Sequence, residues 1–207
     1  MAHYFIEFRF QGRAKKEMKK LIWEVDKRFK LGHARKHRPV PHITIVPPFK
    51  KRDERKLIDD FKEICRKYSM IKFKIEGYGC FPNTKVVYIN IKPSREMLNF
   101  RKNLLKMLKL RYPSYSPHAS IALKLSPNKF ERVKEYINKK RKLSKNYVMA
   151  RATLIKGRRI LCEYDFTLKK LLGRKEAKSK AIYSKTVKRI KREDKCLFSI
   201  LKRLFGK

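Results

Sequence analysis

The sequence predicts an α+β fold with antiparallel sheets. Predicted strands and helices alternate with short turns, and several strands follow one another directly along the chain. A unit of about 35 to 40 residues also occurs twice, each time as a strand, an amphipathic helix and an apolar strand that stops at glycine. Because a repeat of this length is normally one supersecondary unit used twice, we expect two related halves.

The segment before the first copy contains a strand, a helix and a loop. Residues 3–10 alternate between apolar and polar side chains, which predicts a half-buried strand. Apolar residues then recur at helical spacing over 13–30, and Gly32 ends that helix. We expect residues 32–41 to form a loop whose two prolines hold the chain extended as it enters the next strand.

The two copies and the segments that join them account for the remaining elements of the expected domain, residues 1–168. The first copy predicts a helix over 52–68 and a strand over 71–77, and the second predicts a helix over 127–140 and a strand over 147–157. Between the copies we expect a turn at 80–83, a strand over 85–91 and a helix that starts at Pro93-Ser94, and after the second copy a strand over 158–168.

Each copy opens with the same short motif. Pro41-His42-Ile43-Thr44-Ile45 and Pro117-His118-Ala119-Ser120-Ile121 share proline, histidine, a hydroxyl residue and isoleucine at matching positions. Since side chains of a strand alternate between faces, each histidine points the same way as its hydroxyl residue. Two strands side by side would give one site two groups that titrate near neutral pH and two hydroxyls that bind an anion. The alternative is two ordinary core histidines.

Paired His-x-Thr/Ser motifs about 75 residues apart resemble the 2H phosphoesterase superfamily, in particular its RNA 2′,3′-cyclic phosphodiesterases, also called 2′-5′ RNA ligase-like proteins. The resemblance spans roughly residues 3–168 and includes the Pro-Pro-Phe run after the first motif and the Phe81-Pro82 turn. It implies two pseudo-symmetric lobes of antiparallel sheet with flanking helices, each lobe contributing one motif strand to a central groove.

The resemblance also implies catalytic roles for His42, Thr44, His118 and Ser120. One histidine would act as base and the other as acid on a cyclic phosphate, while the hydroxyls hold its oxygens. Water would open the ring at the 3′ oxygen, with His118 as base and His42 as acid, although the symmetry of the motif leaves this assignment open. We expect no metal and no cofactor, because no cluster with metal-ligand spacing accompanies either motif.

Four further residues are candidates for substrate binding. Many relatives carry an arginine five places after the second histidine, where this chain has leucine, so Lys124 is the candidate for the phosphate-facing charge. By strand alternation it would share a face with His118. Phe49, Tyr112 and Tyr115 flank the motifs and are candidates for stacking on a base, with packing in the core or a turn as the alternative.

The charge of the chain points to a polyanionic partner. The formal net charge is +40, from 58 Lys and Arg against 18 Asp and Glu, and such an excess favours RNA through release of counterions. We expect single-stranded RNA ends with a 2′,3′-cyclic phosphate as partner. The alternatives are a phosphodiesterase for 2′-5′ oligonucleotides or small cyclic nucleotides, and a non-catalytic RNA-binding module.

Cysteine usage and hydropathy indicate the compartment. The four cysteines lack the spacing of a disulfide framework or a metal site and are expected to be free thiols in a reducing compartment. No apolar run approaches membrane-spanning length, and the N-terminus opens directly into a strand. We therefore expect a cytoplasmic protein.

Residues 169–207 differ from the rest and are expected to form a basic C-terminal helical extension. They carry 15 Lys and Arg against 3 Asp and Glu. Apolar residues between Leu197 and Phe205 lie on one helical face. Such a helix packs on the protein or a partner, contacts RNA through the polar stretch before it, or lies on a membrane.

Overall fold

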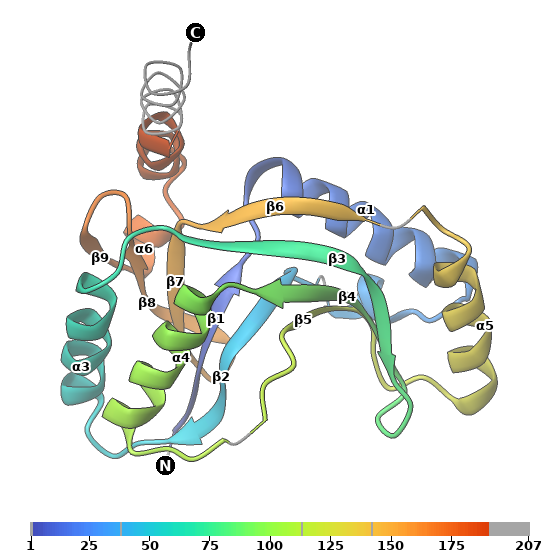
Figure 1. The fold of residues 1–207 in the computed structure, drawn as a ribbon, viewed down its shortest axis with the longest axis horizontal. Helices are drawn as coiled ribbons and strands as arrows, with labels where there is room; N and C mark the ends of the chain where they lie inside the picture. The colour runs from blue at the N-terminus through green and yellow to red at the C-terminus, as the bar shows by residue number, and fades with distance from the viewer. Residues whose placement is uncertain (1, 38, 113, 142, 191–207) are drawn as a thin grey trace, which may run out of the picture.

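A computed structural model describes residues 2–37, 39–112, 114–141 and 143–190. It confirms the α+β class, with two antiparallel sheets around one shared hydrophobic core (Figure 1). Phe8 and Phe10, in and next to the first strand, meet Phe73 of the other sheet edge to face, with ring centroids 5.3 and 6.0 Å apart. Such aromatic pairs add about 0.5–1.5 kcal/mol each to the burial of their surface, so they hold the two sheets together.

The two sheets divide the strands so that each motif lies at an edge. The five-stranded sheet has the order β2-β1-β7-β8-β9, with β1 (His3–Arg9), β2 (His42–Lys50), β7 (Arg151–Lys156), β8 (Arg159–Asp165) and β9 (Lys170–Gly173). The four-stranded sheet has the order β5-β4-β3-β6, with β3 (Ile71–Phe81), β4 (Val86–Pro93), β5 (His118–Ala122) and β6 (Ser144–Met149). The first motif opens β2 and the second opens β5.

Helices lie at both ends of the paired sheets. They are α1 (Gly12–Arg28), α2 (His33–His37), α3 (Glu54–Arg66), α4 (Arg95–Leu108), α5 (Pro127–Asn138) and α6 (Arg174–Ala177). Helices α3 and α4 lie together at one end, while α1 and α5 lie at the other (Figure 1). The side chains of Asp53 and Ser94 accept hydrogen bonds from backbone amides in the first turns of α3 and α4, which fixes where these helices begin.

The repeated unit connects the two sheets. After β2 and α3 the chain enters the four-stranded sheet as β3, and after β5, α5 and β6 it enters the five-stranded sheet as β7. Each copy of the repeat therefore begins in one sheet and continues into the other. This exchange ties the two motif strands to a common core.

Three local predictions are corrected by the structure. Strand β3 does not stop at Gly77, because that residue adopts φ +77° at a shift in register and the strand continues to Phe81. The strand expected over 147–157 is two strands, β6 and β7, that belong to different sheets. The expected loop over 32–41 contains the short helix α2.

The C-terminal residues begin with sheet structure. Strand β9 pairs with β8, so residue 168 lies between two paired strands, and residues 180–190 form a further helical segment beyond α6. This segment rises from the end of the molecule that carries α3 and β9 (Figure 1). The amphipathic stretch from Leu197 to Phe205 lies outside the described residues.

The structure bears on two expectations, that the chain has no membrane-spanning segment and that its cysteines are free thiols. Within residues 2–190, apart from the three positions left undescribed, no helix is long and apolar enough to cross a membrane. Cys65, Cys80 and Cys162 are free thiols, and Cys196 lies outside the described residues.

Candidate active site

The two motif strands have the same pattern of burial. In β2 and in β5, the histidine and the hydroxyl residue are half-buried, whereas the residues between and after them are buried in the core. His42 and Thr44 thus share one face of the first sheet, and His118 and Ser120 share the corresponding face of the second. The alternation that the sequence predicts is present in both copies.

Both histidine rings are held in the same way. Nδ1 of His42 lies 2.8 Å from the carbonyl oxygen of Val40, and Nδ1 of His118 lies 2.8 Å from that of Ser116. Because a carbonyl oxygen only accepts, Nδ1 must carry the proton in each contact, which leaves Nε2 as the nitrogen that gains or loses a proton. In both rings, Nδ1 is therefore held by the carbonyl oxygen of the residue two positions earlier, and Nε2 is left for acid/base chemistry.

The backbone around the motifs repeats this symmetry. The carbonyl oxygen of Pro41 accepts from the amide of Phe10, and that of Pro117 accepts from the amide of Ile91, at 3.0 and 3.3 Å. Each motif strand also has a shift in register directly after its hydroxyl residue. A bulge at this point bends the strand where the functional side chains end.

Contacts between the segment before β5 and β2 bring the two motifs together. Strands β2 and β5 contact each other across the two sheets. The hydroxyl of Tyr115 donates to the carbonyl oxygen of Thr44 at 3.3 Å, and that of Tyr112 donates to the carbonyl oxygen of Pro48 at 3.0 Å. The chain that delivers His118 is thereby tied to the strand that carries His42.

The surroundings of the two histidines differ in one respect that bears on chemistry. Glu7 of β1 is the direct partner of Thr44, and Arg9 is the partner of His42. Glu7 is buried, its Oε2 lies 3.7 Å from Nε2 of His42, and its Oε1 accepts from Nε of Arg9. When His42 is protonated, it therefore faces a carboxylate at close range.

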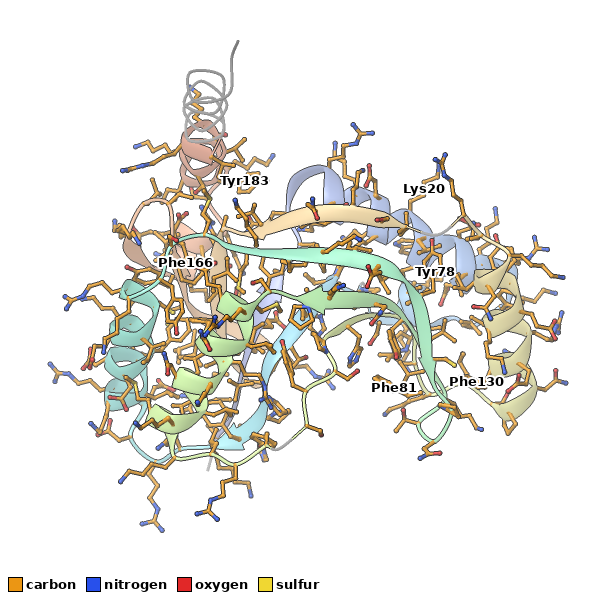
Figure 2. All side chains as sticks on the ribbon, viewed as in Figure 1. Lys20, Tyr78, Phe81, Phe130, Phe166 and Tyr183 are labelled. Carbon is orange, nitrogen blue, oxygen red and sulfur yellow. The ribbon has the colours of Figure 1, made fainter. Side chains whose placement is uncertain are left out.

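His118 has aromatic neighbours in place of a carboxylate. Tyr88 of β4 is the partner of Ser120, at the position that corresponds to Glu7. The ring of Tyr88 lies 5.0 Å and that of Phe81 4.9 Å from the imidazole of His118, centroid to centroid. Phe81 lies at the end of β3, beside the turn into β4 (Figure 2). Burial raises the pKa of the Tyr88 phenol, so this side chain stays neutral at physiological pH.

The structure gives the candidate binding residues different roles. Phe49 is buried at 4% exposure and packs on Tyr4, so the prediction that it stacks on a base is wrong. The argument that placed Lys124 beside His118 also fails, because β5 ends at Ala122 and Lys124 has a left-handed backbone with φ 53°. Tyr112 and Tyr115 use their hydroxyls to connect the two motif segments.

Tyr115 is the more deeply packed of these two tyrosines. The guanidinium of Arg101 lies 4.4 Å from its ring centroid, and burial raises the pKa of the Tyr115 phenol strongly. Arg101 itself donates to the carbonyl oxygen of Tyr112 at 3.1 Å. These contacts order the loop before β5, and they indicate a positioning role for Tyr115 in place of base stacking.

Sequence reasoning missed Glu7, Arg9, Phe81 and Tyr88. All four lie on or next to strands that pair with the motif strands, or at the turn between β3 and β4. Glu7 and Arg9 fit the apolar and polar alternation of residues 3–10, so their charge alone did not mark them as site residues. No group of three or more His, Cys, Asp or Glu side chains suited to a metal ion occurs among the described residues.

The chain belongs to the 2′-5′ RNA ligase superfamily, whose family model matches residues 13–159. That match covers more than two thirds of the chain and includes both motifs, which confirms the resemblance to the 2H phosphoesterases. No curated protein sequence matches the chain.

Solved structures are similar to the chain at low sequence identity. E. coli LigT in its apo form is similar over 79% of this chain and 96% of its own, with 15% identity and a TM-score of 0.50. TT0787 of Thermus thermophilus matches over 80% and 98%, with 13% identity and a TM-score of 0.49. Usb1 of Kluyveromyces marxianus matches over 83% and 97%, with 10% identity and a TM-score of 0.45.

Proposed function

We propose that the chain hydrolyses 2′,3′-cyclic phosphate ends of RNA to 2′-phosphates by a two-histidine mechanism. The observation that carries this proposal is the matched pair of histidines, each held through Nδ1 so that Nε2 is left for proton transfer. Membership of the 2′-5′ RNA ligase superfamily and the net charge of +40 support an RNA substrate.

His118 acts as the base and His42 as the acid. Nε2 of His118 takes a proton from water as the water oxygen attacks phosphorus, and the bond from phosphorus to the 3′ oxygen breaks. That oxygen receives the proton from Nε2 of His42, which leaves a 3′-hydroxyl and a 2′-phosphate. The buried carboxylate of Glu7 supports this assignment, because it faces the charged form of His42, while aromatic rings flank His118.

The hydroxyls of Thr44 and Ser120 hold the non-bridging oxygens of the phosphate. Each hydroxyl lies two residues after its histidine on the same half-buried face. Both hydroxyls can therefore donate to the phosphate on which the imidazoles act. Donors fixed in advance stabilise the charge that builds on these oxygens in the transition state. The two imidazoles supply both proton transfers, so the reaction needs no metal ion.

The same site would join RNA when a 5′-hydroxyl replaces water. The hydroxyl oxygen then attacks phosphorus, the bond to the 3′ oxygen breaks as before, and the product is a 2′-5′ linkage. Hydrolysis of small cyclic nucleotides or of 2′-5′ oligonucleotides uses the same four residues, but the charge of the chain favours a longer strand. A purely RNA-binding module has no use for two histidines held in matching ways.

The test is incubation of EDTA-treated protein with an RNA that ends in a 2′,3′-cyclic phosphate, followed by identification of the product end. We expect the product to carry a 2′-phosphate and to form as fast as it does with protein that has not been treated with EDTA. His118→Ala should form the product about 10²- to 10⁴-fold more slowly while it binds the RNA as the unmodified protein does. Loss of activity in EDTA with recovery on adding a divalent ion, or no hydrolysis by the unmodified protein, would overturn the proposal.

A further inference from the structure

A row of polar side chains runs across the five-stranded sheet from the first motif. Thr44 of β2, Glu7 of β1, Thr153 of β7 and Glu163 of β8 are successive direct partners, so all four lie on the face that carries His42. Oγ1 of Thr153 donates to Glu163 at 2.7 Å. Glu7, Thr153 and Glu163 are all buried. Other parts of the chain therefore cover this face of the sheet from β1 to β8, on the side away from β2.

The C-terminal segment provides part of that cover. Thr186, fully buried, accepts a hydrogen bond from Nη2 of Arg151 at 2.6 Å and donates to Asp165. Arg151 also forms ion pairs with Glu163 and Asp165. Residues beyond Ser179 are thus anchored on the His42 face of the sheet through a buried polar network.

A pocket of about 340 Å³ lies between this segment and the start of α1. Its wall includes Arg9 and Lys15 on one side and Lys178, Lys180 and Tyr183 on the other. Tyr183 marks the base of the C-terminal helical segment, and its hydroxyl lies close against the backbone of Gly12 (Figure 2). Two distant parts of the chain thus contribute cations to one cavity.

The charge in this pocket is unbalanced. Glu163 is the one carboxylate among the described residues of its wall, and Arg151 already pairs with it, while Arg9 pairs with the buried Glu7. Lys15, Lys178 and Lys180 therefore carry the excess charge. The pKa of Lys15 is lowered by burial first, then by the nearby cations Lys19 and Arg9, with Glu163 opposing. Cations that are crowded together at a partly enclosed site favour the binding of an anion.

The pocket adjoins the segment that carries the first motif. Val40 belongs to its wall, and the carbonyl oxygen of Val40 is the one that holds Nδ1 of His42. Arg9 also belongs to the wall and is the direct strand partner of His42. An anion in the pocket would therefore lie near the strand position that carries His42.

We infer that this pocket binds a backbone phosphate of the RNA strand whose cyclic end lies between the two histidines, and that Lys178 and Lys180 supply the C-terminal half of the phosphate contacts. The inference rests on the proposed function for the identity of the strand. It gives the C-terminal segment a role in holding substrate, because backbone phosphates are bound mainly by Lys and Arg and carry most of the affinity for nucleic acid.

The experiment compares the double variant Lys178→Ala/Lys180→Ala with the matched variant Lys102→Ala/Lys106→Ala in the full chain. All four lysines are exposed, and the control pair lies on α4, so both variants lose the same charge. Binding of a short single-stranded RNA with a 3′-phosphate is measured at several salt concentrations. This measurement requires no turnover.

We expect the pocket variant to bind RNA about tenfold more weakly at low salt. Its slope of log K against log salt should be shallower by about 0.7 for each phosphate that the variant no longer neutralises. The control should change much less, and turnover of a mononucleotide 2′,3′-cyclic phosphate should be the same in both. Equal slopes and affinities in the two variants would overturn the inference. The inference would also be overturned if saturating inorganic phosphate did not weaken RNA binding by the unmodified protein.

These results separate the inference from the proposed function. If the pocket variant binds RNA more weakly than the control but the unmodified protein hydrolyses no cyclic phosphate, the proposed function fails and the pocket remains an RNA site. If hydrolysis is observed and the two variants bind alike, the proposed function stands and the pocket is not the site of backbone binding.

Discussion

At the scale of single residues, the two halves of the site hold their histidines in the same way but differ in the residues that surround them. Thr44 faces Glu7 across its strand pair, and Ser120 faces Tyr88. An acid and a base with the same anchoring need different surroundings to take different roles. The carboxylate of Glu7, 3.7 Å from Nε2 of His42, is the difference that the structure provides.

The substitution Glu7→Gln tests this difference. It keeps the shape of the side chain but removes the negative charge that faces protonated His42. We expect kcat for a mononucleotide cyclic phosphate to fall by about tenfold, well below the roughly 10²- to 10⁴-fold that a full acid/base residue contributes, with little change in KM.

Tyr88→Phe is the matched control for that substitution, since Tyr88 occupies the corresponding position beside Ser120. It retains the aromatic ring against His118 and removes only the hydroxyl. An equal loss of kcat in both variants would show that Glu7 has no special relation to the acid.

All four motif residues could be named from the sequence because their pattern is local. His42 and Thr44 are two positions apart, and so are His118 and Ser120, and strand alternation alone puts each pair on one face. Glu7 and Tyr88 depend on the register between neighbouring strands, which no short window of sequence contains. Strand alternation does not support the position predicted for Lys124, because β5 ends at Ala122.

At the scale of elements, the repeat could be recognised from the sequence, but the sheet to which each of its strands belongs could not. Residues 147–156 form one mostly apolar stretch, yet Ala150 separates β6 from β7 and the chain changes sheets there. Apolar periodicity reports burial, and both strands contribute side chains to the same core, Met149 from β6 and Ala152 and Leu154 from β7. The prediction that β3 ends at Gly77 was wrong for a related reason. A glycine with positive φ occurs at a bulge inside a strand as well as at a turn.

The contact between α1 and α5 predicts a dependence of stability on pH. Glu24 of α1 accepts hydrogen bonds from Lys140 and Tyr136 at the end of the chain segment that includes α5, and these contacts lower the pKa of Glu24 below its ordinary value of 4.5. A carboxyl with a lowered pKa stabilises the fold at pH above its ordinary value and loses this contribution as the pH falls through the lowered one.

Thermal unfolding between pH 6 and pH 3 checks this expectation. The unfolding temperature of the unmodified protein should fall more steeply with acidification than that of Glu24→Gln, whose side chain does not titrate. Because Glu24 is more than a third exposed, the difference should be small. Parallel curves for the two proteins would contradict the prediction.

At the scale of the whole molecule, the C-terminal residues are part of the fold as far as Thr186. Strand β9 extends the five-stranded sheet, and Thr186 completes the buried network of Arg151, Glu163 and Asp165. Burial raises the pKa of Glu163, and the nearby Arg151 and Thr153 oppose that shift. Such a network is stable only while every member has its partners.

The substitution Thr186→Val removes the hydroxyl from this network at nearly constant volume. We expect the free energy of unfolding to fall by about 1–3 kcal/mol, since buried polar groups of Arg151 and Asp165 lose a partner. Chemical denaturation measures the change. Thr186→Ser, which keeps the hydroxyl, should retain most of the stability, and equal losses in both variants would count against the hydrogen bonds as the cause.

The same network decides where the chain can be shortened. A chain that ends at Leu168 lacks β9 and Thr186, so we expect it to fold poorly, whereas a chain that ends at Ile190 keeps both. Circular dichroism of the two shortened chains checks this. A stable, cooperatively folded chain ending at Leu168 would show that the C-terminal residues add nothing to the fold.

The central claim is that His42 and His118 act together as one acid/base pair. The most direct measurement is turnover of a 2′,3′-cyclic mononucleotide by His42→Ala, His118→Ala and the double variant. We expect each single variant to lose about 10²- to 10⁴-fold, and the double variant to lose hardly more than either, because residues that act as a unit are not additive. Full activity in either single variant, or a double loss equal to the product of the two single losses, would contradict it.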